Sequence, residues 1–197
     1  MASNPLQVSS FFFVRHGVTE QNFRGLRCGG DVDVPLTDIG CDQAYLLAKQ
    51  IQKMSVDIGV IVASDLIRAR QTALIMSGVL GGLPIEADRL LNERRLGAWN
   101  NQPIADTEAD LARNVTPPGG ESEAEFAARV AGAVENLRPR LARRPLVVSS
   151  KGVGRILNNL LGGDGRLAVS NGEVVEFSLE QSADGKQVLH LNRPHQV

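Results

Sequence analysis

The chain has 197 residues, which is enough for one domain with a full hydrophobic core, whereas two domains would both be small. Its 21 Lys and Arg residues are balanced by 22 Asp and Glu residues. The resulting formal net charge of -1 provides no general attraction for nucleic acid or for an anionic membrane. We therefore expect a single domain in which any anion site is local.

Signals for membranes, disulfides and metals are weak. No stretch approaches the ~18 consecutive apolar residues that span a bilayer, and the N-terminal residues lack the pattern of a signal peptide. Cys28 and Cys41 have neither zinc spacing nor the pattern of a disulfide framework, and His16, His190 and His195 are not spaced as paired ligands. We expect a soluble cytoplasmic protein with a metal-independent mechanism and no cofactor. The oligomeric state is open, and a homodimer is compatible with the sequence.

The first element is a buried strand that stops at a polar loop. Residues 11–14 are all apolar and are followed directly by Arg15, His16 and Gly17. Ligands collect where strands end at the carboxyl edge of an open α/β sheet, so a reactive side chain is well placed at His16. A His in this position is also common as an ordinary hydrogen-bonded loop residue.

Strand and helix patterns alternate along the rest of the chain. Further strands are predicted at residues 57–63, 83–87, 146–149, 172–179 and 187–191, and helices at 37–54, 66–79, 122–141 and 153–161. Ser122 and Glu125 form a capping box for the third helix, whose end Pro139 is expected to kink or shorten. The pattern predicts a three-layer α/β/α fold with a mostly parallel six-stranded sheet that contains one antiparallel strand.

Two long connections interrupt this alternation. Residues 17–36 are rich in Gly and Pro and are predicted to be a loop. Residues 100–120 have weak periodicity and end in a Pro-Pro-Gly-Gly breaker, so we interpret them as a lid or substrate loop within the single domain.

The topology would gather charged and polar residues at one edge of the sheet. Arg15 and His16, the helix start at 64–68, and residues 149–151 all follow parallel strands. Together they provide two guanidinium groups, a lysine, a hydroxyl, an imidazole and a helix N-terminus, a combination that suits phosphate. Glu93 would add a carboxyl group able to donate and accept a proton. The alternative for Arg68 and Glu93 is a surface ion pair.

Five segments resemble motifs of the histidine phosphatase superfamily, the phosphoglycerate-mutase-like proteins. They are residues 14–22 (R-H-G-x-T-x-x-N), 33–40 (D-x-P-L-T-x-x-G), 64–73 (S-x-L-x-R-A-x-Q-T-A), 91–99 (L-x-E-x-x-x-G-x-W) and 118–122 (P-G-G-E-S). The resemblance spans roughly residues 11–180 and points to the small phosphatase branch.

The resemblance implies a role for each matching residue. His16 would be the nucleophile that accepts the phosphoryl group, which agrees with the need for a neutral imidazole with one free ring nitrogen. Arg15, Asn22 and Arg68 would hold the phosphoryl oxygens. Glu93 would protonate the leaving oxygen and later activate water.

The chain departs from the family at the second catalytic histidine. The family's V-S-H-G-G is represented by residues 148–152, in which Ser150 stands in place of the His and Lys151 replaces a Gly. Loss of one preorganised donor typically lowers turnover by ~10²–10³. Lys151 is a poor replacement because adjacent residues in an extended chain point opposite ways. Ser150, Lys151 and Glu121 are nevertheless included among the predicted substrate-binding residues.

Three functions are compatible with this sequence. The first is a phosphatase acting on a small phosphorylated metabolite with reduced or altered activity. The second is a protein that binds phosphate esters without catalysis. The third, a mutase, is less favoured because the chain lacks a Trp before Asn22 and is short for that class.

Overall fold

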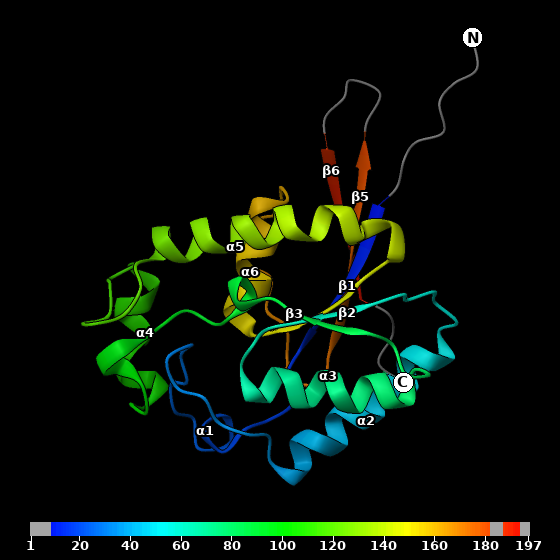
Figure 1. Ribbon diagram of the computed structural model, residues 1–197. Coiled ribbons are helices and arrows are strands. Elements are labelled where there is room, and N and C mark those ends of the chain that lie inside the picture. The colour runs from blue at the N-terminus through cyan, green and yellow to red at the C-terminus, as the bar shows by residue number, and fades with distance from the viewer. Residues whose placement is uncertain (1–8, 182–186, 194–197) are drawn as a thin grey trace.

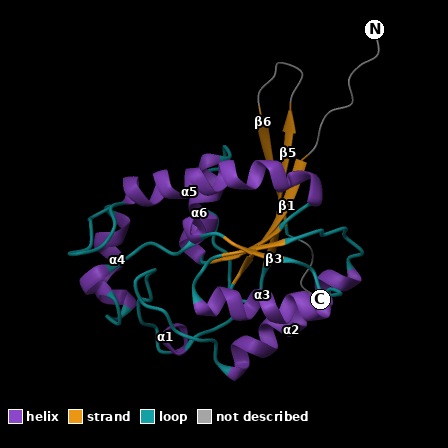
Figure 2. Ribbon diagram, in the orientation of Figure 1, coloured by secondary structure: helices purple, strands orange, loops and turns teal. Residues whose placement is uncertain are grey.

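The computed structural model describes residues 9–181 and 187–193, and it places a six-stranded sheet between two layers of helices (Figures 1 and 2). The strands are β1 (Ser9–Arg15), β2 (Ile61–Ala63), β3 (Ile85–Ala87), β4 (Leu146–Ser149), β5 (Val174–Gln181) and β6 (Gln187–Asn192). The α-helices are α1 (Glu20–Phe23), α2 (Asp38–Lys53), α3 (Ile67–Val79), α4 (Ile104–Ala112), α5 (Glu123–Leu137) and α6 (Lys151–Leu160). Three 3-10 helices are η1 (Arg89–Leu91), η2 (Gly97–Trp99) and η3 (Arg138–Arg143).

The strand order in the sheet is β3-β2-β4-β1-β5-β6. The pairs β3–β2, β2–β4 and β4–β1 are parallel, and β5 is antiparallel to both of its neighbours. Among the described strands β5 is thus the one that runs against the others. The predicted fold class, α/β with a mostly parallel six-stranded sheet and one antiparallel strand, is confirmed.

Each face of β1 is buried under a different pair of helices. Phe11 and Phe13 belong to a core formed with α5 and α6, whereas Phe12 and Val14 pack with α2 and α3. All four side chains are at most 2% exposed. This explains the continuous apolar run, because a strand covered on both faces has no solvent side to make polar. Figure 1 shows α5 and α6 on one side of the sheet and α2 and α3 on the other.

Two of the predicted helix starts are confirmed by their caps. The Thr37 hydroxyl accepts a hydrogen bond from Gly40 N at 3.1 Å and begins α2. Ser122 and Glu125 form the expected capping box at the start of α5. This helix ends at Leu137, and Pro139 lies in η3 immediately after it.

Other boundaries differ from the predictions. The second strand is limited to Ile61–Ala63 and not 57–63. Before it, Gly59 N donates outside the sheet, to Arg143 O at 2.8 Å. Helix α3 begins at Ile67 instead of at Ser64, whose hydroxyl bonds to the Asn92 side chain at 2.9 Å. Helix α6 begins at Lys151, two residues earlier than expected.

Both long connections contain a helix that the sequence pattern did not indicate. Helix α1 lies within residues 17–36, and α4 lies within residues 100–120. The two connections touch: Leu26 and Pro103 form an isolated bridge, and the Arg27 guanidinium bonds to Thr107 at 2.8 Å and to Glu108 at 2.5 Å. A lid role for residues 100–120 stays a prediction. None of the helices described is both long enough and apolar enough to cross a membrane.

Candidate active site

His16 and Ser150 follow neighbouring parallel strands at the carboxyl edge of the sheet. Arg15, the last residue of β1, is in register with Ser149, the last residue of β4. The His16 N–H donates to Ser149 O at 2.9 Å, so the two chains are still paired where the strands end. β2 ends beside β4 and leads into α3, whose second residue is Arg68. The expected convergence at this edge is therefore present.

His16 is held in the form that a nucleophile requires. Its side chain is almost fully buried, and its Nδ1 lies 2.8 Å from Gly17 O. A carbonyl oxygen can only accept, so this contact assigns the proton to Nδ1 and leaves a free lone pair on Nε2. Burial, and then the positive charges of Arg68 and Arg15, hold the pKa of His16 well below its ordinary value. The imidazole is consequently neutral at physiological pH.

Arg68, which is buried, and Arg15, which is half-buried, provide positive charge beside His16. Arg68 is 1% exposed, and its guanidinium donates to Val32 O at 2.9 Å and to Gly29 O at 3.2 Å. Arg15 donates to Val169 O at 3.3 Å. Burial and the charge of Arg68 lower the pKa of Arg15, although the charge of Glu93 opposes this. In the described part of the chain neither guanidinium is in an ion pair, although a buried charge such as that of Arg68 is usually paired.

Three buried polar atoms around His16 have no hydrogen-bond partner among the described residues. They are Arg15 Nε, Arg68 Nε and Ser150 Oγ. Ser150 is 2% exposed and precedes α6 as its N-cap, yet its hydroxyl makes no capping bond. Two cationic donors and a hydroxyl at a helix N-terminus form a suitable set of ligands for an anion with several oxygens.

The Glu93 carboxylate is fixed by two backbone N–H groups. Oε1 accepts from Arg94 N at 2.8 Å, and Oε2 accepts from Gly152 N at 3.0 Å. Gly152 is the second residue of α6, where the helix dipole favours a carboxylate. A Cβ at position 152 would overlap Glu93 Oε1, so glycine is required for this approach. Glu93 therefore lies at the same helix N-terminus as Ser150.

The remaining three predicted residues differ in their surroundings. Asn22 Oδ1 accepts from Thr19 N at 3.3 Å in the capping box of α1. Lys151 is exposed, whereas Ser150 beside it is buried. Glu121 is 3% exposed, and both of its oxygens are bonded to Arg129, at 2.9 and 2.8 Å. The structure thus brings Arg15, Arg68, Glu93 and Ser150 together around His16, and it gives Glu121 protein partners.

A family model matches nearly the whole of this described fold. Residues 11–193 match the model of the histidine phosphatase superfamily (branch 1). The chain belongs to this superfamily.

Similar proteins include phosphatases and a mutase. The Yersinia pestis protein named "Probable phosphoglycerate mutase GpmB" is 34% identical over 163 residues, covering 77% of this chain and 74% of its own. The structure of a mycobacterial glucosyl-3-phosphoglycerate phosphatase with VO3 has a TM-score of 0.76 and 28% identity, covering 95% of this chain and 100% of the other. The structure called mycobacterial hydrolase 1 has a TM-score of 0.80 and 27% identity, and the match covers 96% of this chain and 100% of the other. The resemblance found in the motifs is confirmed.

Several residues of the matching motifs hold together the segments that carry His16 and Arg68. Gly17 and Gly40 lie in segments that approach so closely that a Cβ on Gly17 would overlap Gly40 O. Thr72 Oγ1 accepts from Gly17 N at 3.2 Å, which ties α3 to the residue after His16. Asp33 Oδ1 accepts from Ile67 N at 2.7 Å and caps the N-terminus of α3, next to Arg68.

Other residues near the site were not indicated by the sequence. Asn171 Nδ2 donates to His16 O at 2.6 Å, and Asn92 Oδ1 accepts from Asp65 N at 2.9 Å. Both contacts join segments distant in sequence, so no local pattern could have revealed them. Within residues 9–181 and 187–193, no three His, Cys, Asp or Glu side chains are grouped as metal ligands would be.

Proposed function

We propose that the chain is a phosphatase that hydrolyses a small phosphate monoester through a phosphohistidine on His16. The observation that supports this most strongly is the state of His16: Nδ1 is bonded to Gly17 O, Nε2 is free, and the pKa is lowered by burial and by two arginines. A neutral imidazole beside two guanidinium groups that have no carboxylate partner is equipped to attack a dianionic phosphoryl group.

Two displacements complete the proposed cycle. His16 Nε2 attacks phosphorus, the bond to the ester oxygen breaks, and Glu93 protonates the departing oxygen. Glu93 then takes a proton from water, whose oxygen attacks the phosphohistidine and releases inorganic phosphate. Arg15, Arg68 and the side-chain amide of Asn22 would hold the phosphoryl oxygens during both steps. No step in this cycle requires a metal ion or an organic cofactor.

The same site gives Ser150 a defined part in this proposal. We place it at the position of the second catalytic histidine of the superfamily. Its buried hydroxyl can donate to a phosphoryl oxygen, but a neutral donor replaces only part of a charge-assisted bond. We therefore propose activity that is reduced relative to phosphatases with both histidines. Lys151 is exposed, and both carboxylate oxygens of Glu121 are bonded to Arg129, so we assign neither residue a contact with the phosphoryl group.

The second candidate is a protein that binds phosphate esters without turning them over. The unpartnered Ser150 hydroxyl favours it, because the anion ligands are present while one catalytic donor is changed. A mutase is the third candidate, supported by the name of the Yersinia pestis relative.

Turnover of an aryl phosphate separates the first two candidates. We expect slow hydrolysis by the wild type, none by His16→Ala, and an increase of about 10²-fold for Ser150→His. Micromolar binding of a phosphate ester without any turnover would favour the binding protein. Incubation with 3-phosphoglycerate tests the mutase, which would isomerise it, whereas the proposed phosphatase would release phosphate. Glucosyl-3-phosphoglycerate, named for the mycobacterial neighbour, is the first further substrate to test.

A further inference from the structure

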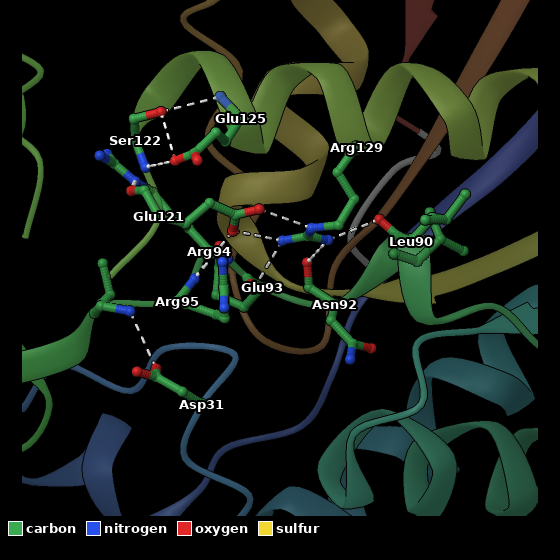
Figure 3. Close-up of polar contacts among 12 residues, drawn as sticks. Asp31, Leu90, Asn92, Glu93, Arg94, Arg95, Glu121, Ser122, Glu125 and Arg129 are labelled. Atoms are coloured by element: carbon green, nitrogen blue, oxygen red, sulfur yellow. Dashed lines mark hydrogen bonds and ion pairs between the residues drawn. The ribbon is translucent and has the colours of Figure 1, made fainter. Parts of the chain in front are cut away.

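The Arg129 guanidinium of α5 contacts the segment that contains Glu93. Its Nη1 donates to Leu90 O at 2.9 Å and to Asn92 O at 2.8 Å, and its Nη2 donates to Glu93 O at 3.2 Å. Figure 3 shows these contacts converging on one guanidinium between α5 and the chain that follows η1. Three carbonyl groups within four consecutive residues are therefore bonded to a single side chain.

The other donors of Arg129 are bonded to Glu121. Nε donates to Oε1 at 2.9 Å and Nη2 donates to Oε2 at 2.8 Å. With the three carbonyl contacts this makes five bonds, which equals the five N–H donors of a guanidinium. Arg129 consequently has no spare donor for a ligand, so its contribution to the site is indirect.

Glu121 holds the Arg129 guanidinium in place and also bonds to the main chain at Arg95. Burial alone would raise the pKa of Glu121, but the hydrogen bonds and the charge of Arg129 hold it below its ordinary value. Glu121 Oε2 also accepts from Arg95 N at 3.2 Å, as Figure 3 shows. The pair therefore fixes the main chain on both sides of Glu93, at Asn92 and at Arg95.

The Glu93 side chain is fixed separately, by Arg94 N and Gly152 N. The direction in which the carboxylate points depends on the main chain that Arg129 holds. We propose that Arg129, paired with Glu121, is a positioning residue that aims the Glu93 carboxyl group at the departing oxygen. This rests on the proposed phosphatase activity, and it gives Glu121 a supporting role in place of the substrate contact expected from the sequence.

Leaving groups of different basicity test this role. Nitrophenolate departs without protonation, whereas the alkoxide of glycerol phosphate needs a proton from Glu93. The values of kcat/KM cover only the steps up to phosphoryl transfer to His16, so their ratio for the two substrates reports proton donation. This ratio is independent of how much of a variant is folded.

Arg129→Gln is expected to lower kcat/KM for glycerol phosphate by about 10–100-fold, and that for nitrophenyl phosphate by less than about threefold. Glu93→Gln should change the ratio in the same direction and by more. Arg129→Lys, which keeps the charge but has fewer donors, should give an intermediate ratio, and it replaces Arg129→Gln in the test if the latter does not fold. The matched control is Arg138→Gln, an exposed residue just after α5 whose partner Glu135 is also exposed, and it should leave the ratio unchanged.

An unchanged ratio in Arg129→Gln or Arg129→Lys, with wild-type turnover of both substrates, would overturn the positioning role alone. Equal loss on both substrates would do the same, since it would indicate general destabilisation of the site. A wild type that turns over neither substrate would refute the proposed phosphatase, and the role of Arg129 with it.

Discussion

The ionisation of His16 is set by its burial and by its two arginine neighbours. The folded pKa lies well below the value of 6.5 expected for an unfolded chain. Between these two values the unfolded chain binds a proton that the folded chain does not, so stability falls as pH decreases below about 6.5. The largest possible slope from one such group is about 1.4 kcal/mol per pH unit.

This linkage predicts a difference between wild type and His16→Asn. We expect the wild type to lose more free energy of unfolding than the variant between about pH 7.5 and about pH 5.5, as measured by urea denaturation. Arg15 and Arg68 are present in both proteins, so a difference between the two pH profiles reports the residue at position 16. Equal losses in the two proteins would show that His16 titrates normally in the folded state.

Adding one methyl group at Gly152 tests whether the position of the Glu93 carboxylate matters for turnover. Gly152→Ala would push the Glu93 carboxylate off its contact with Gly152 N, because the new Cβ would overlap Oε1. We expect turnover of glycerol phosphate to fall by about tenfold or more. The matched control is Gly78→Ala in α3, where a Cβ meets nothing within 4 Å. It should stabilise the fold by about 0.5–1 kcal/mol and leave turnover intact, whereas equal effects of both substitutions would contradict the assignment.

At the scale of elements, α4 has polar contacts with the segment that follows α1. Thr107 is its one buried residue, and this residue bonds to the Arg27 side chain. The Leu26–Pro103 bridge is next to these contacts. Residues 24–27 and α4 therefore form a connected unit, and Figure 1 shows α1 and α4 at the same end of the sheet.

We predict that Arg27→Gln loosens α4 selectively. Loss of the bonds to Thr107 and Glu108 should raise the amide hydrogen exchange of residues 104–112 by about tenfold, while exchange in α5 stays unchanged. Arg113→Gln is the control, because its ion pair with Asp110 lies on the exposed side of the same segment. Unchanged exchange in Arg27→Gln would show that apolar packing holds α4.

Elements with a local signal were predictable from the sequence, and those that depend on distant contacts were not. The caps at Thr37 and Ser122 and the mainly apolar run 146–149 identified α2, β4 and the start of α5. The end of α5 was predicted at residue 141, whereas the helix ends at Leu137. Helix α4 was not predicted: no side chain caps its start, and Thr107 is its one buried residue. The strand at 57–63 was predicted too long, because buried apolar residues need not pair in a sheet.

The same distinction applies to the site. His16, Arg68 and Glu93 could be predicted to lie together because each follows a strand or begins a helix within a recognisable motif. Glu121 was predicted to contact substrate, but its partner Arg129 could not be foreseen, since nothing in a helix sequence shows which arginine faces a buried carboxylate.

At the scale of the whole molecule, one sheet separates two hydrophobic cores. Phe126 of α5 is fully buried in one core and Ile51 of α2 in the other. If the chain folds as a single domain, damage to either core must destabilise both. This follows because β1 and β4 contribute side chains to each of them.

We expect Phe126→Ala and Ile51→Ala each to lower the free energy of unfolding by about 2–5 kcal/mol. Fluorescence of Trp99, the single tryptophan, and far-UV circular dichroism should report one coincident transition in both variants. Leu74→Ala, at a side chain that is 67% exposed, should change stability by less than about 1 kcal/mol. Two separate transitions would contradict a single domain.

The central claim concerns His16 as the phosphoryl acceptor, and trapping the intermediate tests it most directly. The wild type is mixed with an aryl phosphate, quenched in alkali and digested, and the peptides are examined by mass spectrometry. We predict an acid-labile, alkali-stable phosphoryl group on the peptide that contains His16, and its absence in His16→Asn. Substrate turnover without phosphate on His16, or with the same label retained in His16→Asn, would contradict the account.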